Sequence, residues 1–233
     1  AITAVTVQNT VGVQAVHPVP LDILEGQIDA VLSDIGADAV KIGMLHSAEV
    51  VNLVADKIKE YDVTNLVLDP VMVSTSGHKL IEDSAVEVIK ERLLPLARVV
   101  TPNVPEAEIL IGRPISGESD FEAVAEELAE SYGVSVLLKA GHLSGDILTD
   151  YFYNSEDRHT TLLPSKRVQT NNTHGTGCTL SSALAAALAK GLDLTSAAKS
   201  AKGYIEQAII YGADYEIGKG HGPVNHFHPN VQF

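Results

Sequence analysis

The sequence has few residues of several kinds, and each shortage narrows what the protein can be. It contains no Trp, one Cys, two Met and only 5% aromatic residues among its 233 positions. Aliphatic side chains must therefore fill the core that a chain of this length can bury. A single cysteine cannot form an internal disulfide, which is typical of proteins in a reducing compartment, so we expect a cytoplasmic location.

Basic residues are also scarce, with 16 Lys and Arg against 30 Asp and Glu and a formal net charge of −14. A surface of this sign repels phosphate backbones and anionic lipids, so we expect neither nucleic acid nor a membrane as a partner. No apolar run is long enough to span a bilayer. The first residues, "AITAVTVQNT", resemble a strand already under way and not a secretory signal. A small phosphorylated ligand remains compatible with this charge, since it needs only a local group of donors.

The sequence is rich in short aliphatic runs that alternate with longer segments of helical periodicity. Near-continuous apolar strands separated by such segments predict an α/β fold, in which helices cover both faces of a mostly parallel sheet. We expect a single domain over residues 1–233, with a β-hairpin at the sheet edge over 150–154 and 159–164, and a capping box from Ser119 to Glu122. The expected strands are 5–8, 38–45, 65–70, 98–103 and 134–142, and the expected helices are 21–36, 47–62, 82–97, 119–133, 179–191 and 194–212.

Polar residues follow several of these strands, where parallel α/β sheets bind their ligands. Asp69 and Glu106 are acidic groups suited to holding Mg²⁺ through water, and Lys139 could neutralise a phosphate. Each residue also has a simpler interpretation. Asp69 could belong to a strand-end turn, Glu106 could interact with the dipole of a helix, and Lys139 could be a surface lysine.

The segment "NTHGTGC", residues 172–178, places two glycines and the only cysteine at the start of an alanine-rich helix. A Gly-x-Gly that opens a helix leaves free N–H groups at the positive end of the helix dipole, which suits a phosphate. The same position lowers the pKa of a thiol, so a Cys178 thiolate could accept a proton from an alcohol. The alternatives are an ordinary helix start and a small buried cysteine. Neither a Walker motif nor the motifs of protein kinases occur, so a kinase with these residues would belong to another fold class.

Several segments together resemble the hydroxymethylpyrimidine/phosphomethylpyrimidine kinases of thiamine biosynthesis, within the ribokinase-like superfamily. The resemblance runs from residue 1 to about Phe227. It implies a three-layer α/β/α fold, a homodimer, and Mg-ATP-dependent phosphorylation of 4-amino-5-hydroxymethyl-2-methylpyrimidine and then of its monophosphate. The segments that carry it are "AVKIGML", "LVLDPVMVSTSGHKL", "TPNVPEAE", "NTHGTGCTLSSALAAALAKG" and "IGKGHGPVNHF".

The resemblance also implies roles for individual residues. Cys178 resembles the residue that replaces the catalytic aspartate of the superfamily. Gln8 and Met44 match positions that bind the pyrimidine, and an amide at Gln8 can both donate to and accept from an aminopyrimidine edge. A polar residue at a strand end is the simpler interpretation of Gln8. The other implied residues are Gly175, Thr176 and Gly177 in the anion hole, Asp69 and Glu106 at the metal, and Asn103, Lys139 and Thr173 at ATP.

The sequence departs from this family at its start. The family begins with a strand and a glycine-rich segment whose aspartate contacts the substrate, and no such segment occurs in this sequence. We therefore expect the biological protein to contain on the order of 30 additional residues, equivalent to one strand and one helix.

Other functions are compatible with some of these residues. A pyridoxal kinase of the same branch can share the cysteine-bearing anion hole, although "VQNT" and the tail "GHGPVNHF" favour a pyrimidine. A ribokinase-type sugar kinase should carry an aspartate at the position of Cys178. A catalytically inactive binding protein is a third alternative. We interpret "VSTSGHK", residues 73–79, as a candidate lid, and His221, His226 and His228 as surface or subunit-contact residues.

Overall fold

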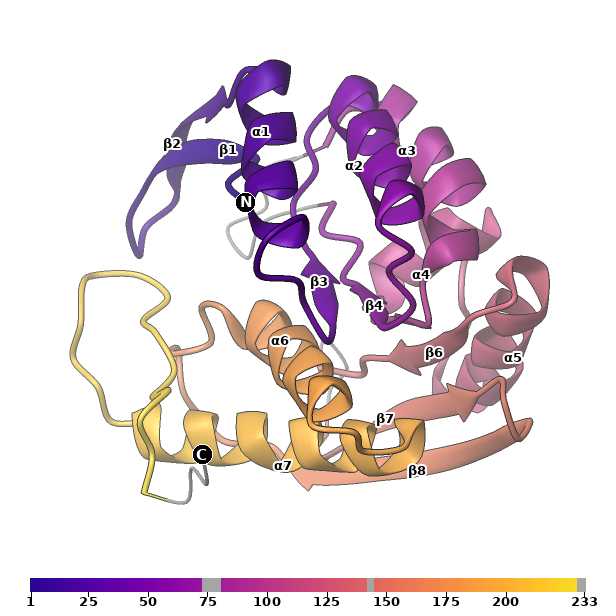
Figure 1. Cartoon of the computed structure of the whole chain (residues 1–233). Coiled ribbons are helices and arrows are strands. Elements are labelled where there is room, and N and C mark those ends of the chain that lie inside the picture. Colours follow the sequence, from indigo (N-terminus) through magenta and orange to yellow (C-terminus); the bar gives the residue numbers. More distant parts are fainter. Residues whose placement is uncertain (73–80, 142–144, 230–233) are drawn as a thin grey trace.

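A computed structural model describes residues 1–72, 81–141 and 145–229 of the chain. The candidate lid at 73–79 lies outside these residues. Within them, the chain forms a six-stranded sheet and a separate two-stranded sheet (Figure 1). Helices cover both faces of the larger sheet, and this three-layer arrangement confirms the predicted α/β fold class.

The six-stranded sheet has the order β3-β4-β5-β6-β7-β8, so each strand pairs with the next one along the chain. The first four strands are parallel, and β7 and β8 form an antiparallel hairpin at the edge, as predicted. Because the parallel strands run the same way, their carboxyl ends lie along one edge of the sheet. The strands are β3 (Val40–Ile42), β4 (Leu66–Leu68), β5 (Val99–Val100), β6 (Ser135–Leu138), β7 (Ile147–Asn154) and β8 (His159–Lys166).

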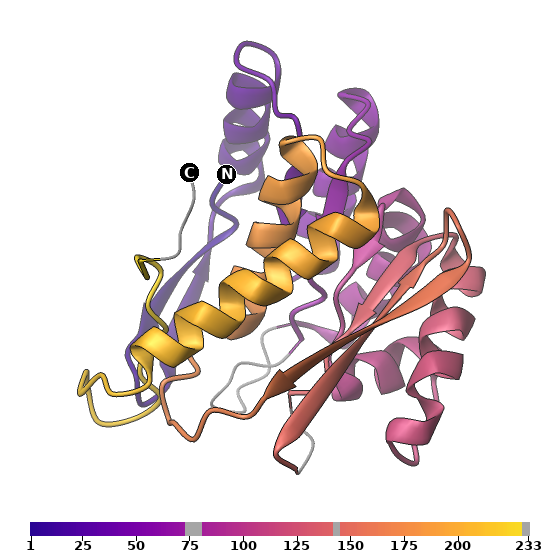
Figure 2. The same ribbon diagram turned by 90° about the horizontal axis from the view of Figure 1, so that it is seen from below.

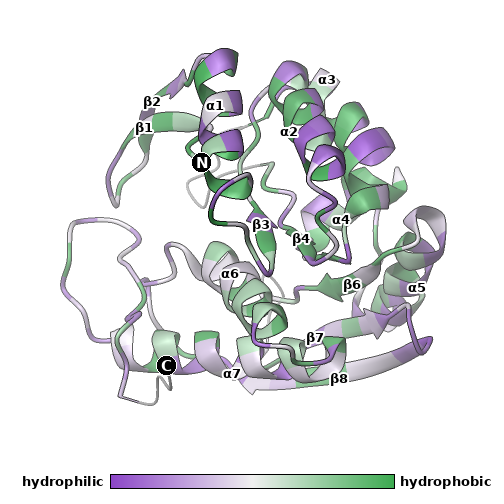
Figure 3. Cartoon of the chain, in the orientation of Figure 1, coloured by the Kyte–Doolittle hydropathy of each residue, from purple (hydrophilic) through white to green (hydrophobic). Residues whose placement is uncertain are grey.

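Alternation along the strands divides the core into two layers. In β4, Leu66 and Leu68 pack with the helices that precede β7, whereas Val67 packs with the two helices that follow β8. The central strands are accordingly hydrophobic in Figure 3. None of the helices in the described residues is both long and apolar enough to cross a membrane. The helices that precede β7 are α1 (Leu21–Leu32), α2 (Ala48–Glu60), α3 (Asp83–Val88), α4 (Val104–Ile111) and α5 (Phe121–Tyr132). The two helices that follow β8 are α6 (Thr176–Ala189) and α7 (Leu194–Gly212), which cross in Figure 2.

Two expected helices differ from the prediction. The segment 82–97 continues from α3 into a π-helical turn (Ile89–Leu93) and a 3₁₀ turn (Leu94–Leu96). The capping box at Ser119 was wrong, because the 3₁₀ turn Glu118–Asp120 precedes α5 and places Ser119 inside that turn. The N-cap of α5 is Asp120, which makes no side-chain cap hydrogen bond.

The strand expected at 5–8 forms, but it pairs with a partner that the sequence analysis missed. β1 (Ala4–Gln8) and β2 (Val13–Pro18) make an antiparallel hairpin outside the main sheet. The Thr10 carbonyl at the tip of this hairpin accepts a hydrogen bond from His221 N–H at 2.9 Å. A Cβ at Gly220 would lie 2.1 Å from the same carbonyl. Part of the glycine-rich tail is therefore explained by its close approach to this hairpin.

The tail histidines have different environments. His221 and His226 are exposed, as predicted. His228 is only 3% exposed, and its ring lies 5.0 Å from that of Tyr204 and 6.2 Å from that of Tyr211. Its assignment to the surface was wrong, because it packs against the aromatic residues of α7.

Candidate active site

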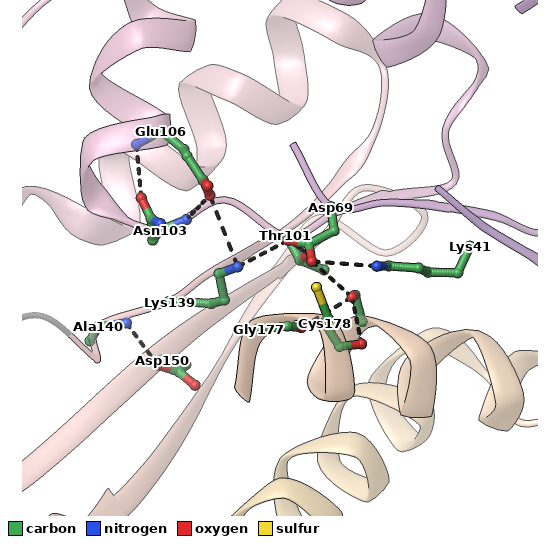
Figure 4. A network of polar contacts seen from close by, with 11 residues as sticks. Lys41, Asp69, Thr101, Asn103, Glu106, Lys139, Ala140, Asp150, Gly177 and Cys178 are labelled. Atoms are coloured by element: carbon green, nitrogen blue, oxygen red, sulfur yellow. Dashed lines mark hydrogen bonds and ion pairs between the residues drawn. The ribbon is translucent and has the colours of Figure 1, made fainter. Parts of the chain in front are cut away.

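The carboxyl ends of the parallel strands bring several predicted site residues together at the start of α6 (Figure 4). Asp69 follows β4, Lys139 follows β6, and Cys178 lies in the first turn of α6. Asp69 and Lys139 meet although 70 residues separate them in the chain. The meeting of Asp69 and Lys139 was expected from the parallel sheet, whereas the position of α6 beside them was not.

The Asp69 carboxylate is the centre of the polar network. Its Oδ1 atom accepts hydrogen bonds from Lys139 Nζ at 3.1 Å and Thr101 Oγ1 at 3.2 Å. Its Oδ2 atom accepts one from Ser181 Oγ at 3.0 Å and lies 3.7 Å from Lys41 Nζ. Burial by itself would raise the pKa of Asp69, but the two lysines and the hydroxyl of Ser181 hold it below its usual value. The carboxylate is therefore held as an anion, although Asp69 is only 1% exposed.

Asn103 and Glu106 form the capping box of α4. Asn103 Oδ1 accepts from Glu106 N–H at 2.9 Å, and Glu106 Oε2 accepts from Asn103 N–H at 2.9 Å. The same Oε2 atom lies 4.0 Å from Lys139 Nζ. The structural and functional interpretations of Glu106 are thus compatible, because capping the helix fixes its carboxylate beside the lysine.

Burial and charge act in opposite directions on the ionisable groups around Lys139. Burial raises the pKa of Glu106, and the attraction of Lys139 only partly offsets it. Burial would lower the pKa of Lys139, but Asp69 and Glu106 outweigh that effect and raise it. Lys139 therefore stays charged between the two carboxylates, where it can attract a phosphate.

The first turn of α6 offers backbone donors to the same region. Gly175 is the N-cap of the helix and has a φ of 83°, a left-handed conformation that favours glycine. The first i to i−4 hydrogen bond runs from Thr179 N–H to the Gly175 carbonyl, so the N–H groups of Gly177 and Cys178 precede this ladder. A Cβ at Gly177 would lie 3.4 Å from Lys139 Nζ. Backbone donors that have no partner among the described residues and the partly buried Lys139 ammonium group therefore face the same space.

The loop before α6 is anchored by Asn172, which the sequence analysis did not select. The Asn172 side chain is buried, and its Nδ2 atom donates to the carbonyls of Gly212, Ala213 and Tyr215 at 2.9, 3.1 and 2.8 Å. In the same loop, the Thr173 carbonyl accepts a hydrogen bond from Thr176 N–H at 3.3 Å. The end of α7 therefore helps to hold the glycine turn in position.

The environment of Cys178 differs from the expectation. The residue is exposed, yet desolvation of its thiolate by the surrounding protein raises the pKa of the thiol. Lys41 and Lys139 lower this pKa, but the negative charge of Asp69 opposes them. The expected lowering of the thiol pKa was wrong, because desolvation and Asp69 outweigh the two lysines.

The two residues assigned to the pyrimidine are not joined to the Asp69 network by any hydrogen bond or ion pair of the described residues. Met44 follows β3, is partly buried, and accepts a hydrogen bond from Thr3 Oγ1 at its carbonyl at 2.9 Å. Gln8 is exposed at the end of β1. Among the described residues, no hydrogen bond or ion pair joins either side chain to Asp69 or Cys178.

The structure adds residues that the sequence analysis did not select. Lys41 could have been noticed as a charged residue inside the apolar run "AVKIGML". Asp150, on β7, accepts from Ala140 N–H at 2.8 Å and from Lys202 Nζ at 2.7 Å. Ser181 and Thr101 gave no signal, since short hydroxyl side chains occur throughout the sequence. Lys41, Ser181 and Thr101 contact Asp69, whereas Asp150 holds the backbone that follows Lys139.

A lysine between two carboxylates, facing the free N–H groups of a helix, is suited to stabilising a phosphoryl group during transfer. The fold and this site define an α/β kinase that lacks a Walker loop. The profile of the family described as phosphomethylpyrimidine kinase matches residues 1–225. A hydroxymethylpyrimidine/phosphomethylpyrimidine kinase of Rhizobium meliloti is 47% identical over 228 residues, which cover 97% of this chain and 85% of the relative. The chain therefore belongs to the phosphomethylpyrimidine kinase family.

Solved structures agree with this assignment and confirm the ribokinase-like fold. A phosphomethylpyrimidine kinase of Clostridium difficile is 40% identical, with a TM-score of 0.76 over 89% of this chain and 84% of that chain. The pyridoxal kinase of Staphylococcus aureus, in complex with pyridoxal, is 32% identical, with a TM-score of 0.88 over 99% of this chain and 82% of that chain. By sequence identity this chain is more similar to the phosphomethylpyrimidine kinase, whereas by TM-score it is more similar to the pyridoxal kinase. Because the backbone is shared by enzymes with different substrates, identity is the better guide to substrate.

Proposed function

We propose that the protein uses ATP to phosphorylate 4-amino-5-hydroxymethyl-2-methylpyrimidine and then phosphorylates the resulting monophosphate to the diphosphate. The observation that carries this proposal is the position of Lys139, whose Nζ atom lies 3.1 Å from Asp69 and 4.0 Å from Glu106 opposite the first turn of α6. The identity of 47% to a relative named for these two substrates supports the choice of pyrimidine.

The residues around α6 would stabilise the phosphoryl group that moves from ATP. In the first step, the hydroxymethyl oxygen forms a bond to the γ-phosphorus while the bond from that phosphorus to the β–γ bridging oxygen breaks. The electron pair leaves with ADP, and the proton of the hydroxyl group passes to water. Negative charge on the transferring group is stabilised by the N–H groups of Gly177 and Cys178 and by the Lys139 ammonium.

Cys178 would position the acceptor hydroxyl. Since the pKa of its thiol is raised, the thiol is protonated at neutral pH and is a poor general base. A loose transition state for phosphoryl transfer asks little of a base, because the attacking oxygen loses its proton late. Cys178 therefore acts by contact with the hydroxymethyl group in this proposal.

The acidic residues fit a magnesium ion that is bound together with ATP. Mg²⁺ is usually held by one or two carboxylates, several waters and the phosphates of the substrate. Asp69 and Glu106 supply two carboxylates at the site, while no group of three or more His, Cys, Asp or Glu that could hold a metal occurs in the described residues. Asp69 and Glu106 would thus hold the ion with the help of ATP, and the ion would neutralise charge on its phosphates. The Asn103 side chain, which caps α4, would keep Glu106 in place.

Phosphorylation of pyridoxal is the second candidate activity. The TM-score of 0.88 to a pyridoxal kinase with bound pyridoxal favours it. Against it stand the higher identity to pyrimidine kinases and the family profile. Gln8 and Met44 are the residues that we propose to contact the ring of the substrate. A homodimer and a cytoplasmic location stay predictions.

A competition experiment tests the proposed function. The protein is incubated with Mg-ATP and equal amounts of hydroxymethylpyrimidine and pyridoxal, and the products are weighed by mass spectrometry. We expect pyrimidine monophosphate followed by diphosphate. Pyridoxal phosphate as the main product would overturn the choice of substrate and leave the phosphate site unaffected. Binding of ATP without any product would favour a catalytically inactive relative.

A further inference from the structure

Lys41 is a charged residue in a strand of the main sheet, and its side chain is turned toward the candidate active site. In the register of β3 and β4, Lys41 lies opposite Val67, which packs with α6 and α7. The Lys41 side chain is only 18% exposed, and its Nζ atom lies 3.7 Å from Asp69 Oδ2. Position 43 is a glycine, where a Cβ would lie 2.7 Å from Lys41 Nζ. The absence of a side chain at Gly43 therefore leaves the space that the ammonium group occupies.

Lys41 and Lys139 lie on opposite sides of the Asp69 carboxylate. Lys139 contacts Oδ1 and is also close to Glu106, whereas Lys41 approaches Oδ2. Figure 4 shows the sulfur of Cys178 between the two ammonium groups. Lys139 therefore lies on the side of Glu106 and ATP in the proposed function, and Lys41 lies on the other side, in the strand that leads to Met44.

The two lysines also differ in how closely they are held. Lys139 forms a hydrogen bond with Asp69 at 3.1 Å, whereas the distance from Lys41 Nζ to the carboxylate is 3.7 Å. Among the described residues, Asp69 is the one acidic partner of Lys41. A lysine ammonium group has three donors. Lys41 can therefore bind an anion in the site while it remains close to Asp69.

We propose that Lys41 binds the phosphate of the monophosphate acceptor and is required chiefly for the second phosphorylation. This inference rests on the proposed function, in which one site acts on two acceptors of different charge. The first acceptor is a neutral alcohol, whereas a phosphate monoester carries a charge of about −1.5 to −2 at neutral pH. Two phosphates that approach each other repel, and a cation on the acceptor side reduces this repulsion.

The second step then follows the same geometry with a different nucleophile. A terminal oxygen of the monophosphate forms a bond to the γ-phosphorus of ATP, and the bond from that phosphorus to the β–γ bridging oxygen breaks. The electron pair leaves with ADP, and no proton has to move when the acceptor is a dianion. Lys41 contacts the acceptor phosphate throughout, and Lys139 contacts the phosphates of the donor.

The test measures both steps separately in variants of the two lysines. Lys41→Met keeps the length of the side chain and removes the charge, Lys41→Arg keeps the charge, and Lys139→Met is the control for the donor side. Steady-state kcat/KM is measured with hydroxymethylpyrimidine and, independently, with its monophosphate. For Lys41→Met we expect a loss of about 100-fold with the monophosphate and a smaller loss, of about 10-fold, with the alcohol, because Lys41 also lies beside the Asp69 carboxylate. Lys41→Arg should retain the second step to within about 10-fold, and Lys139→Met should lower both steps to a similar extent.

The first step also serves as the folding control, because a variant that phosphorylates the alcohol has an intact site. Equal losses of both steps in Lys41→Met would overturn the inference and assign Lys41 to the positioning of Asp69. Unchanged kinetics with the monophosphate would overturn it as well. If the unmodified protein phosphorylates neither acceptor, the proposed function itself fails. This result can be told apart from a failure of the inference, which appears only as the pattern of losses in Lys41→Met.

Discussion

Replacement of Asp150 tests how the sheet holds the lysine of the candidate active site. Asp150 is 5% exposed, and within the described residues each of its two oxygens has one partner. Oδ1 accepts from Ala140 N–H at 2.8 Å, directly after Lys139 in the chain, and Oδ2 accepts from Lys202 Nζ at 2.7 Å. Asp150→Ala removes both interactions, whereas Asp150→Asn keeps an oxygen that can accept from Ala140 but removes the charge.

The structure sets the expected sizes of these effects. Asp150→Ala leaves the Lys202 side chain, which is only 13% exposed, without its anion and leaves the buried Ala140 N–H without its acceptor. Removal of one partner of a buried ion pair costs about 3–5 kcal/mol, and an unsatisfied buried donor costs about 1–3 kcal/mol. Because the two costs overlap in one side chain, we expect the free energy of unfolding to fall by about 4 kcal/mol for Asp150→Ala and by about 2 kcal/mol for Asp150→Asn.

Urea unfolding followed by circular dichroism measures these changes, with Lys202→Met and the double variant completing a double-mutant cycle. We also expect the KM for ATP to rise about 10-fold in Asp150→Ala and less in Asp150→Asn, since the backbone next to Lys139 loses its support. Equal destabilisation by Asn and Ala would show that the bond to Ala140 contributes nothing. An unchanged KM for ATP in a destabilised Asp150→Ala protein would refute the link to Lys139.

Three further predictions concern other parts of the molecule. Cys178→Ala should lower turnover about 100-fold and leave the melting temperature nearly unchanged, because the residue is exposed; near-normal steady-state kinetics would assign it to packing. Gly220→Ala should destabilise the protein by about 1–3 kcal/mol, since its Cβ would lie 2.1 Å from the Thr10 carbonyl. In thermal unfolding the control Gly26→Ala, which meets nothing within 4 Å, should show no such loss. The lowered pKa of Asp69 means that its contribution to stability is present above its unfolded pKa and is lost as pH falls through the folded value. Asp69→Asn should therefore flatten the decrease of stability below about pH 4, and an unchanged slope in acid unfolding would contradict this.

Much of the fold could be predicted because its signals are local in the chain. The alternation of apolar runs with segments of helical period indicated the main sheet and the helices on both faces. The pairing of β1 with β2 was missed, and the capping box predicted at the start of α5 was wrong. Residues 13–18 are mostly exposed in the structure, so their pattern carries no clear signal of a buried face. At Ser119, a sequence match to a capping box could not reveal that a 3₁₀ turn would form first.

The convergence of Asp69 and Lys139 also followed from sequence, because parallel strands end at one edge of a sheet. The start of α6, which follows the antiparallel hairpin, was placed with them only by the tertiary structure. The electrostatics of that edge depended on the tertiary structure. Asp69 is kept ionised in part by Ser181, which lies 112 residues away in the chain, and Lys41 approaches from the edge strand. The same surroundings raise the pKa of Cys178, opposite to the effect of its helix position alone. The sequence by itself thus determined the elements, their order and the residues that can meet. Only the tertiary structure decided which of them are charged and in contact, since a pKa depends on burial and on neighbours that are distant in the chain.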